Sequence, residues 1–212
     1  MTEHATSPLP PPGNDLRARN LERNRTEVAD VAVKLFLERG FDNVTIDDIA
    51  AAAGISKRTF FRYFETKEDA VLPYEDTRLN AFRQLLAQRE PGQSILACVQ
   101  QAAITLVSEP EVPDCSWMRA RMELARDNPS VHAHSLQLRS QWETEVRDLI
   151  AEHLGEPPEE SMTANVVAAA AIGAVRAAGQ VWLSTDDDAD LGDLVAEAFE
   201  LLADGLTRDA VV

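Results

Sequence analysis

The chain has 212 residues, of which 45% are hydrophobic, and a formal net charge of −16. This length allows one large domain or two of unequal size, and the hydrophobic content is sufficient for a packed core, which excludes a wholly disordered chain. No uninterrupted apolar run reaches membrane-spanning length, no secretory signal pattern begins the chain, and its two cysteines follow no metal or redox spacing. We therefore expect a cytoplasmic protein with reduced cysteines.

The charge is distributed unevenly along the chain. Residues 1–72 contain 10 basic and 12 acidic residues, whereas residues 73–212 contain 10 basic and 24 acidic residues. All three lysines (Lys34, Lys57 and Lys67) lie in the first part. The net charge disfavours nucleic-acid binding, but the local field at a docking face decides that question, and the acidic excess belongs to the second part.

The first predicted helix follows a polar, proline-rich tail. Residues 1–15 contain four prolines and almost nothing to bury, so we expect them to be disordered. The next segment, "LRARNLERNR", carries four arginines and is either a solvated helical lead-in or a basic arm. From Thr26 apolar residues recur with the period of a helix, which Gly40 ends. These apolar residues are Val28, Val31, Ala32, Leu35 and Phe36.

Two short helices follow, and both begin with a capping residue. Thr45 with Asp48 three residues later forms a capping-box pattern, and Ser56 is placed to cap the next helix. Between them, "AGI" at residues 53–55 predicts a tight turn. Two short helices joined by a glycine-containing turn, after a longer helix, are typical of a helix-turn-helix.

The remainder of the chain is predicted to be helical. Thr66 and Asp69 form a second capping pattern that predicts a fourth helix, which Pro73 must end or kink. The further helices are predicted at residues 75–89, 93–107, 115–127, 130–154, 160–184 and 190–207. The expected fold is all-α, with a tail at 1–15, a helix-turn-helix domain at 16–72 and a larger helical domain at 73–212.

The segment from Ser56 to Phe64 has one apolar face and one cationic face. On a helical wheel the rings of Phe60 and Phe64 form a buried anchor, and the opposite arc carries two arginines, a threonine and a tyrosine. Guanidinium groups suit guanine edges in the DNA major groove, and hydroxyl and ammonium groups suit phosphates. The candidate DNA-contacting residues are Thr45, Ser56, Lys57, Arg58, Thr59, Arg62, Tyr63 and Lys67.

Residues 25 to 72 resemble the DNA-binding domain of the TetR family of bacterial transcriptional regulators. The matching positions are Gly40-Phe41, Thr45, Ile49-Ala50, Gly54-Ile55-Ser56, Thr59, Tyr63-Phe64 and Lys67-Glu68. The resemblance implies that the helix from Ser56 to Phe64 is the recognition helix and that Lys67 contacts a phosphate. It also implies a second, all-helical domain for ligand binding and dimerisation. The expected function is a homodimeric regulator, a repressor that binds a palindromic operator and releases it when a small molecule binds.

The second domain contains residues suited to an apolar, anionic ligand. The candidates are Trp117, Met118, Met122, Trp142, Arg176 and Trp182. Each aromatic or methionine is either core or ligand wall. Arg176 is the only charge between Thr163 and Thr185, so it needs either a carboxylate of the protein or an anionic ligand. The stretch "RMELARDNPSV" and the Ala/Val-rich helix near Gly173 resemble a subgroup associated with acyl-CoA-like ligands, which implies an acyl-CoA or fatty-acid effector.

Dimerisation is predicted to use the last two helices. Ala169, Gly173 and Ala177 recur at four-residue spacing, which allows another backbone to approach. The last helix carries an apolar face, and with their symmetry mates the two helices form a four-helix interface. The residues of that face are Leu191, Leu194, Val195, Ala198, Phe199, Leu202 and Leu206.

Motifs of enzymes are missing from the sequence. It contains no G-x-S-x-G elbow, no glycine-rich phosphate loop and no H-E-x-x-H, so we expect no catalysis, no cofactor and no metal. Two alternatives to a ligand-released regulator stay open. One is a ligand-independent architectural DNA-binding protein, and the other is a helical dimerisation module with a vestigial helix-turn-helix.

Overall fold

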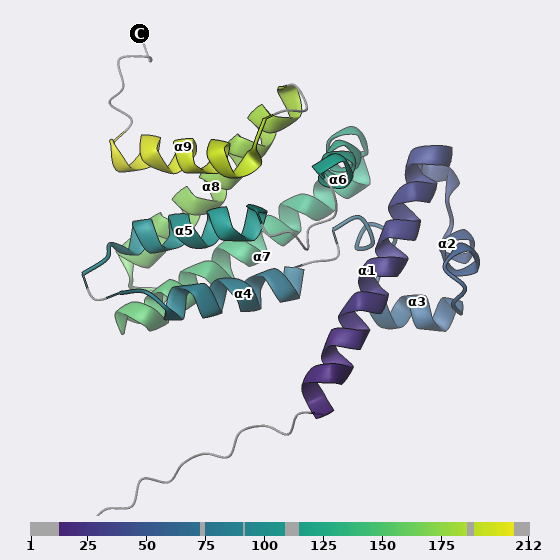
Figure 1. Cartoon of the computed structure of the whole chain (residues 1–212), viewed down its shortest axis with the longest axis horizontal. Helices are drawn as coiled ribbons and strands as arrows, with labels where there is room; N and C mark the ends of the chain where they lie inside the picture. Colours follow the sequence, from purple (N-terminus) through teal and green to yellow (C-terminus); the bar gives the residue numbers. More distant parts are fainter. Residues whose placement is uncertain (1–12, 73–74, 91, 109–114, 186–188, 206–212) are drawn as a thin grey trace, which may run out of the picture. The chain divides into compact units, whose positions relative to one another are not determined.

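The computed structural model describes residues 13–72, 75–90, 92–108, 115–185 and 189–205. Over these residues the chain forms nine α-helices and one 3-10 helix and no strand, which confirms the predicted all-α class (Figure 1). The chain divides into two compact units, unit 1 (Met1–Pro73) and unit 2 (Tyr74–Val212). Each unit has its own buried residues and is described by itself below.

Unit 1 is a three-helix arrangement built on one long helix. Its elements are α1 (Gly13–Arg39), η1 (Phe41–Asn43), α2 (Ile46–Ala52) and α3 (Lys57–Tyr63). Helix α1 contacts both η1 and α2, and α2 contacts α3. The buried face of α1 includes Phe36, whose ring centroid lies 4.7 Å from that of Phe41. Gly40, at φ 82°, makes the sharp exit from α1 that brings Phe41 back onto this face.

The start of α1 corrects the predicted tail. Helix α1 begins at Gly13, so the last three residues of the expected disordered segment 1–15 are helical. The arginine-rich segment that follows is therefore helical and forms part of α1. Within it, the Arg23 guanidinium lies 3.7 Å from the Glu27 carboxylate, one helical turn later. Residues 1–12 lie outside the described residues.

The fourth helix predicted at Thr66 is wrong, because residues 67–71 form turns. The capping interaction itself is present. The Asp69 carboxylate accepts hydrogen bonds of 2.8 Å from the backbone N–H groups of Glu65 and Thr66. The helix does not continue because Pro73 lacks an N–H group and disfavours the helical conformation of the residue before it.

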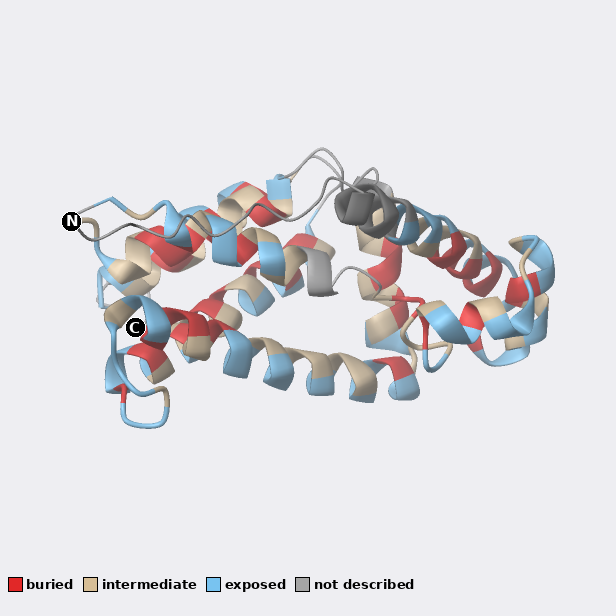
Figure 2. Cartoon of the chain, turned by 90° about the horizontal axis from the view of Figure 1, so that it is seen from below, coloured by how far each residue is buried: buried red, intermediate tan, exposed pale blue. Residues whose placement is uncertain are grey.

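Over its described residues, unit 2 consists of six helices. They are α4 (Glu75–Ala87), α5 (Ile95–Ser108), α6 (Cys115–Asp127), α7 (Pro129–Leu154), α8 (Met162–Ser184) and α9 (Leu191–Ala203). Each begins within two residues of its predicted start. Figure 2 shows buried and exposed residues alternating around the helices, so that each helix has an inner and an outer face.

Helix α8 is the centre of unit 2. It packs against α5, α6, α7 and α9, and its inner face consists mainly of alanines, which allow close approach of the neighbouring helices. Gly179 permits the closest of these contacts. A Cβ atom at this position would lie 2.7 Å from the terminal methyl carbon of Met122, so α6 rests where α8 has no side chain.

The apolar face of α9, predicted to form the dimer interface, lies mostly inside unit 2. Val195 and Phe199 belong to the buried core, and Leu191, Leu194, Ala198 and Leu202 pack against it. Helix α9 contacts α5 and α8 of the same chain through this face. An amphipathic pattern shows that a face is buried without showing which surface buries it. Leu206 lies outside the described residues.

Helix α8 also corrects the membrane analysis. By length and composition it is apolar enough to cross a bilayer, with a mean hydropathy of 1.6 over its best window. Counting uninterrupted apolar residues missed this because Arg176 and several small polar residues interrupt the run. The helix packs in the core of unit 2, and a core helix of this kind passes the same test.

Candidate nucleic-acid interface

The start of α2 is fixed by a reciprocal cap. The Thr45 hydroxyl accepts a hydrogen bond of 3.2 Å from the Asp48 backbone N–H, and the Asp48 carboxylate accepts one of 2.9 Å from the Thr45 backbone N–H. The Thr45 hydroxyl also donates to that carboxylate at 2.5 Å, and this bond is the main reason why the pKa of Asp48 lies below its usual value. The cap confirms the predicted start of the helix-turn-helix, and it already uses the hydroxyl of a candidate DNA contact.

The start of α3 is fixed in the same way. Gly54, at φ 66°, makes the turn between the two helices, and the Ile55 N–H donates to the Ala50 carbonyl at 2.9 Å. The Ser56 hydroxyl accepts from the Thr59 backbone N–H at 3.0 Å and lies 2.9 Å from the Thr59 hydroxyl. The orientation of α3 therefore follows from local turn and cap chemistry.

The rings of Phe60 and Phe64 anchor α3 to unit 1, as predicted. Phe60 is 0% exposed and Phe64 is 2% exposed, with ring centroids 5.2 Å apart. The guanidinium of Arg25, from α1, lies 5.5 Å from the Phe64 ring centroid. This anchoring leaves the opposite side of α3 facing solvent.

Phe61 is exposed on α3, and the sequence analysis did not include it among the DNA contacts. Its side chain is 50% exposed and meets the Phe60 ring edge to face, with centroids 5.8 Å apart. A shallow hollow at this surface is lined by Arg58, Thr59, Phe61 and Arg62. The wheel position of Phe61, beside the buried arc, concealed its exposure.

The two arginines of α3 are both exposed, but their surroundings differ. Arg58 makes no hydrogen bond or ion pair with any residue in the described part of the chain. Arg62 donates a hydrogen bond of 3.0 Å to the Tyr63 hydroxyl, and its guanidinium carbon lies 5.0 Å from the Tyr63 ring centroid. Arg62 must therefore leave Tyr63 to meet a base edge.

The two candidate lysines are both partnered. Lys57 lies 2.9 Å from the Asp47 carboxylate, so this ion pair joins the starts of α2 and α3. The ammonium of Lys67 donates to the Phe41 carbonyl at 2.9 Å and to the Val44 carbonyl at 3.4 Å, and lies 4.2 Å from the Phe41 ring centroid. Two of its three N–H donors are thus used inside unit 1. The resemblance implied a phosphate contact, and the structure adds this positioning role.

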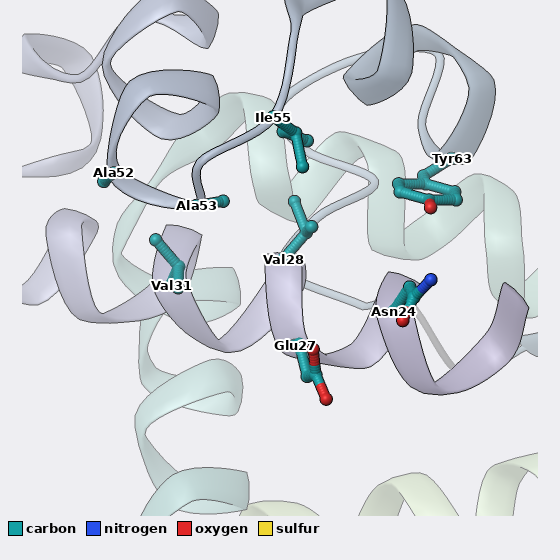
Figure 3. A pocket seen from close by; sticks show the side chains of 8 residues that line it. All are labelled: Asn24, Glu27, Val28, Val31, Ala52, Ala53, Ile55 and Tyr63. Atoms are coloured by element: carbon teal, nitrogen blue, oxygen red, sulfur yellow. The ribbon is translucent and has the colours of Figure 1, made fainter. Parts of the chain in front are cut away.

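A second hollow of about 410 Å³ lies between α1 and the helix-turn-helix. Figure 3 shows Val28 and Ile55 pointing toward each other across it, with Tyr63 at one end and Glu27 pointing away. Asn24, Val31, Ala52 and Ala53 complete its lining. Tyr63 thus lines this hollow together with residues of α1 and is half-buried, although the wheel placed it on the exposed arc.

Neither of the two hollows described above is lined by the ligand candidates of unit 2. Trp182 is buried, and its indole N–H donates to the Ala189 carbonyl at 2.9 Å. The Arg119 guanidinium lies 4.5 Å from its ring centroid. Met122 packs on Gly179, and Trp142 packs against the unit 2 core. All three side chains contribute to packing inside unit 2.

Trp117 and Met118 on α6 are half-buried, as are Met122 and Trp142. Arg176 lies at the surface of α8 and donates a hydrogen bond of 3.0 Å to the Gln180 side chain, so the partner described for it is an amide and not a carboxylate of the protein. Burial lowers the pKa of Arg139 on α7, and the charge of Arg176 lowers it further. Among the described residues no cluster suited to a metal ion exists.

Comparison with known proteins agrees with this geometry. Residues 28–72 match the profile of "Bacterial regulatory proteins, tetR family", and residues 93–207 match the "MftR C-terminal domain". The chain is 30% identical, over 85% of its own length and 90% of the relative, to the putative mycofactocin biosynthesis transcriptional regulator MftR of Mycobacterium tuberculosis. It is 28% identical to the HTH-type transcriptional regulator TcmR of Streptomyces glaucescens, covering 92% of this chain and 88% of that one.

A solved structure has a similar fold. The transcriptional regulator FadR from Bacillus subtilis, crystallised in complex with stearoyl-CoA, superposes with a TM-score of 0.56. The match covers 84% of this chain and 97% of that chain at 19% identity. This likeness shows a shared fold.

Proposed function

Because the chain belongs to the TetR family and is a DNA-binding transcriptional regulator, we propose that it is a repressor that binds a palindromic operator as a homodimer and is released by a small molecule. The observation that carries the proposal is the capped helix α3, which is anchored by two buried rings and turns two arginines to solvent. The family is one of regulators and not of enzymes, as the sequence analysis expected. Such a protein acts in the bacterial cytoplasm.

The reading of bases is assigned to α3. Exposed guanidinium groups on Arg58 and Arg62 suit bidentate contact with guanine, and the Thr59 methyl and the Phe61 ring suit a thymine methyl. The other candidates contact phosphates or hold the helices in place. They are Thr45, Ser56, Lys57, Tyr63 and Lys67. For Lys67 one ammonium donor is still available for a phosphate, since two are used inside the unit.

The homodimer is assigned to the outer face of α8. Met162, Val166 and Val181 are 75%, 57% and 47% exposed, and they follow one stripe of the helix together with the small residues 169, 173 and 177. A Cβ atom at Gly173 would meet nothing within 4 Å, so the subunit leaves space there for a second backbone. A stripe of this kind on a soluble protein is stabilised when a symmetry mate covers it.

The effector is proposed to be an apolar molecule with an anionic group, of the fatty-acid or acyl-CoA class. One support is the set of methionines and aromatic rings on α6 and α7. A second is the repulsion between the charges of Arg139 and Arg176, which an anion bound between them would relieve. FadR from Bacillus subtilis, which shares the fold, binds stearoyl-CoA in its crystal structure. Of the six candidates, Arg176 is exposed and Trp182 is buried in the core, and the other four are half-buried.

A gel shift on the DNA upstream of the protein's own gene tests this function. We expect a complex whose affinity falls steeply with salt concentration and which dissociates when cell extract supplies the effector. An architectural protein would bind equally to unrelated DNA and ignore the extract. A vestigial helix-turn-helix would give no salt-dependent complex, and either result would overturn the proposal.

A further inference from the structure

We infer that Asp47 sets the affinity of the protein for DNA by holding the Lys57 ammonium away from phosphates. The inference rests on the proposed function, since it concerns how strongly the same helix-turn-helix binds. Its evidence is the ion pair of 2.9 Å between the Lys57 ammonium and one Asp47 carboxylate oxygen. A carboxylate is an unexpected group on a surface that must approach a polyanion.

The position of the pair places it where DNA passes. Asp47 is the second residue of α2, and Lys57 is the first residue of α3. When a helix-turn-helix docks, the first residues of the recognition helix approach the bases and the preceding helix crosses the phosphate backbone. Lys57 is therefore at the end of α3 that meets the duplex, beside Arg58.

Stability does not explain why the carboxylate is present. The Lys57 side chain is 53% exposed and the Asp47 side chain is 68% exposed, and an ion pair between exposed groups contributes little to folding stability. The ends of both helices are already fixed by the caps at Thr45 and Ser56. Removing the charge of Asp47 should therefore leave the fold intact.

Removing the charge of Asp47 should affect DNA affinity more than folding stability. A phosphate contact by Lys57 requires the ammonium to leave Asp47, and the carboxylate that remains repels the same phosphates at a distance well within the Debye length of about 10 Å. Since every sequence presents phosphates, the penalty applies to all DNA alike. Asp47 therefore lowers the equilibrium affinity for every duplex.

The test compares Asp47→Asn with Glu38→Gln in the full-length protein. Glu38 is an exposed acid on α1, so its variant removes the same charge from unit 1 without touching the helix-turn-helix. The probes are the tightest duplex selected by the wild type from random DNA and a base-scrambled duplex of equal length. Dissociation constants are measured at several salt concentrations.

We expect Asp47→Asn to tighten binding to both duplexes by about 3- to 10-fold and to steepen the salt dependence by about one charge, whereas Glu38→Gln changes little. In a Lys57→Ala background, Asp47→Asn should give a clearly smaller gain, because it then relieves only the direct repulsion of phosphates and frees no ammonium. The inference is overturned if Asp47→Asn matches Glu38→Gln, if it weakens binding to the selected duplex alone, or if the gain is equally large without Lys57. A wild type that binds neither duplex would instead overturn the proposed function.

Discussion

The cations of the helix-turn-helix differ in what they give up when DNA binds. Arg58 exchanges only water, because no described residue bonds to it, whereas Arg62 must release the Tyr63 hydroxyl. Lys57 must leave a carboxylate, and Lys67 keeps two backbone carbonyls. A net binding energy is the difference between the new contact and the lost one, so similar cations on one surface contribute unequally.

The first prediction concerns the two arginines. Arg58→Ala should weaken binding to the preferred sequence by about 1–3 kcal/mol, and Arg62→Ala should weaken it less, because Arg62 already has a partner in the free protein. The matched control is Arg58→Lys, which keeps the charge but loses the planar fork, so it should lose sequence preference while retaining affinity for scrambled DNA. If Arg58→Ala and the wild type had equal affinity in a gel shift, α3 would not be the recognition helix.

The second prediction concerns Lys67. Lys67→Met removes two charge-assisted hydrogen bonds to the backbone of residues 41 and 44, so it should destabilise unit 1 by about 1–3 kcal/mol. Urea unfolding followed by far-UV circular dichroism measures the loss.

The control for Lys67 is Lys34→Met, which removes an exposed ammonium from α1 and should leave stability nearly unchanged. If the two variants were equally stable while only Lys67→Met lost DNA affinity, Lys67 would be a phosphate contact alone. The positioning role would then be wrong.

At the scale of the elements, local chemistry made the helix-turn-helix predictable. The caps at Thr45 and Ser56 and the turn at Gly54 act within a few residues, so their spacing alone indicates the structure. The partners of Lys67 lie 26 and 23 residues away, and no local pattern encodes them. Asp69 shows the same limit of local patterns. Its capping hydrogen bonds were predicted correctly, but turns follow them and not a helix.

The predicted ligand and dimer faces show a second limit of prediction from sequence. Trp182 and the apolar residues of α9 carry the pattern of a buried surface, and both are buried inside unit 2. Sequence periodicity cannot distinguish burial within one chain from burial against a ligand or a second chain. In α8, by contrast, the stripe through Gly173 stays uncovered in the single chain.

The third prediction follows from that stripe. Gly173→Glu should yield a folded monomer, because the subunit has open space at this position and the charge would lie between the two copies of α8. Sedimentation should show the loss of the dimer, and binding to a full operator should weaken with it. Ala87→Glu, at an exposed position of α4, is the matched control and should stay dimeric. A wild-type monomer at micromolar concentration would contradict the assignment.

For the whole molecule, the fourth prediction concerns coupling between effector and DNA. A ligand that releases DNA must bind the DNA-free form more tightly, and DNA must weaken ligand binding by the same factor, typically about 5- to 150-fold. Titrating fatty acids and acyl-CoAs should change tryptophan fluorescence and operator affinity together, since all three tryptophans lie in unit 2. Arg176→Ala should weaken this response. The control is Arg83→Ala, which removes an exposed arginine of α4 that likewise donates to an amide side chain of its own helix, Asn80. Fluorescence changes without any loss of operator affinity would mean a bound ligand that is no inducer.

Selection of tight-binding duplexes from random DNA by the full-length protein tests the central claim most directly. A dimeric helix-turn-helix regulator should enrich one sequence, a palindrome whose half-sites are centred about one helical turn apart, ~34–36 Å or slightly more. Arg58→Ala should change the enriched bases within each half-site, and binding to the selected duplex should fall steeply with salt. Recovery of no common sequence, or of a single unpaired half-site, would contradict the account.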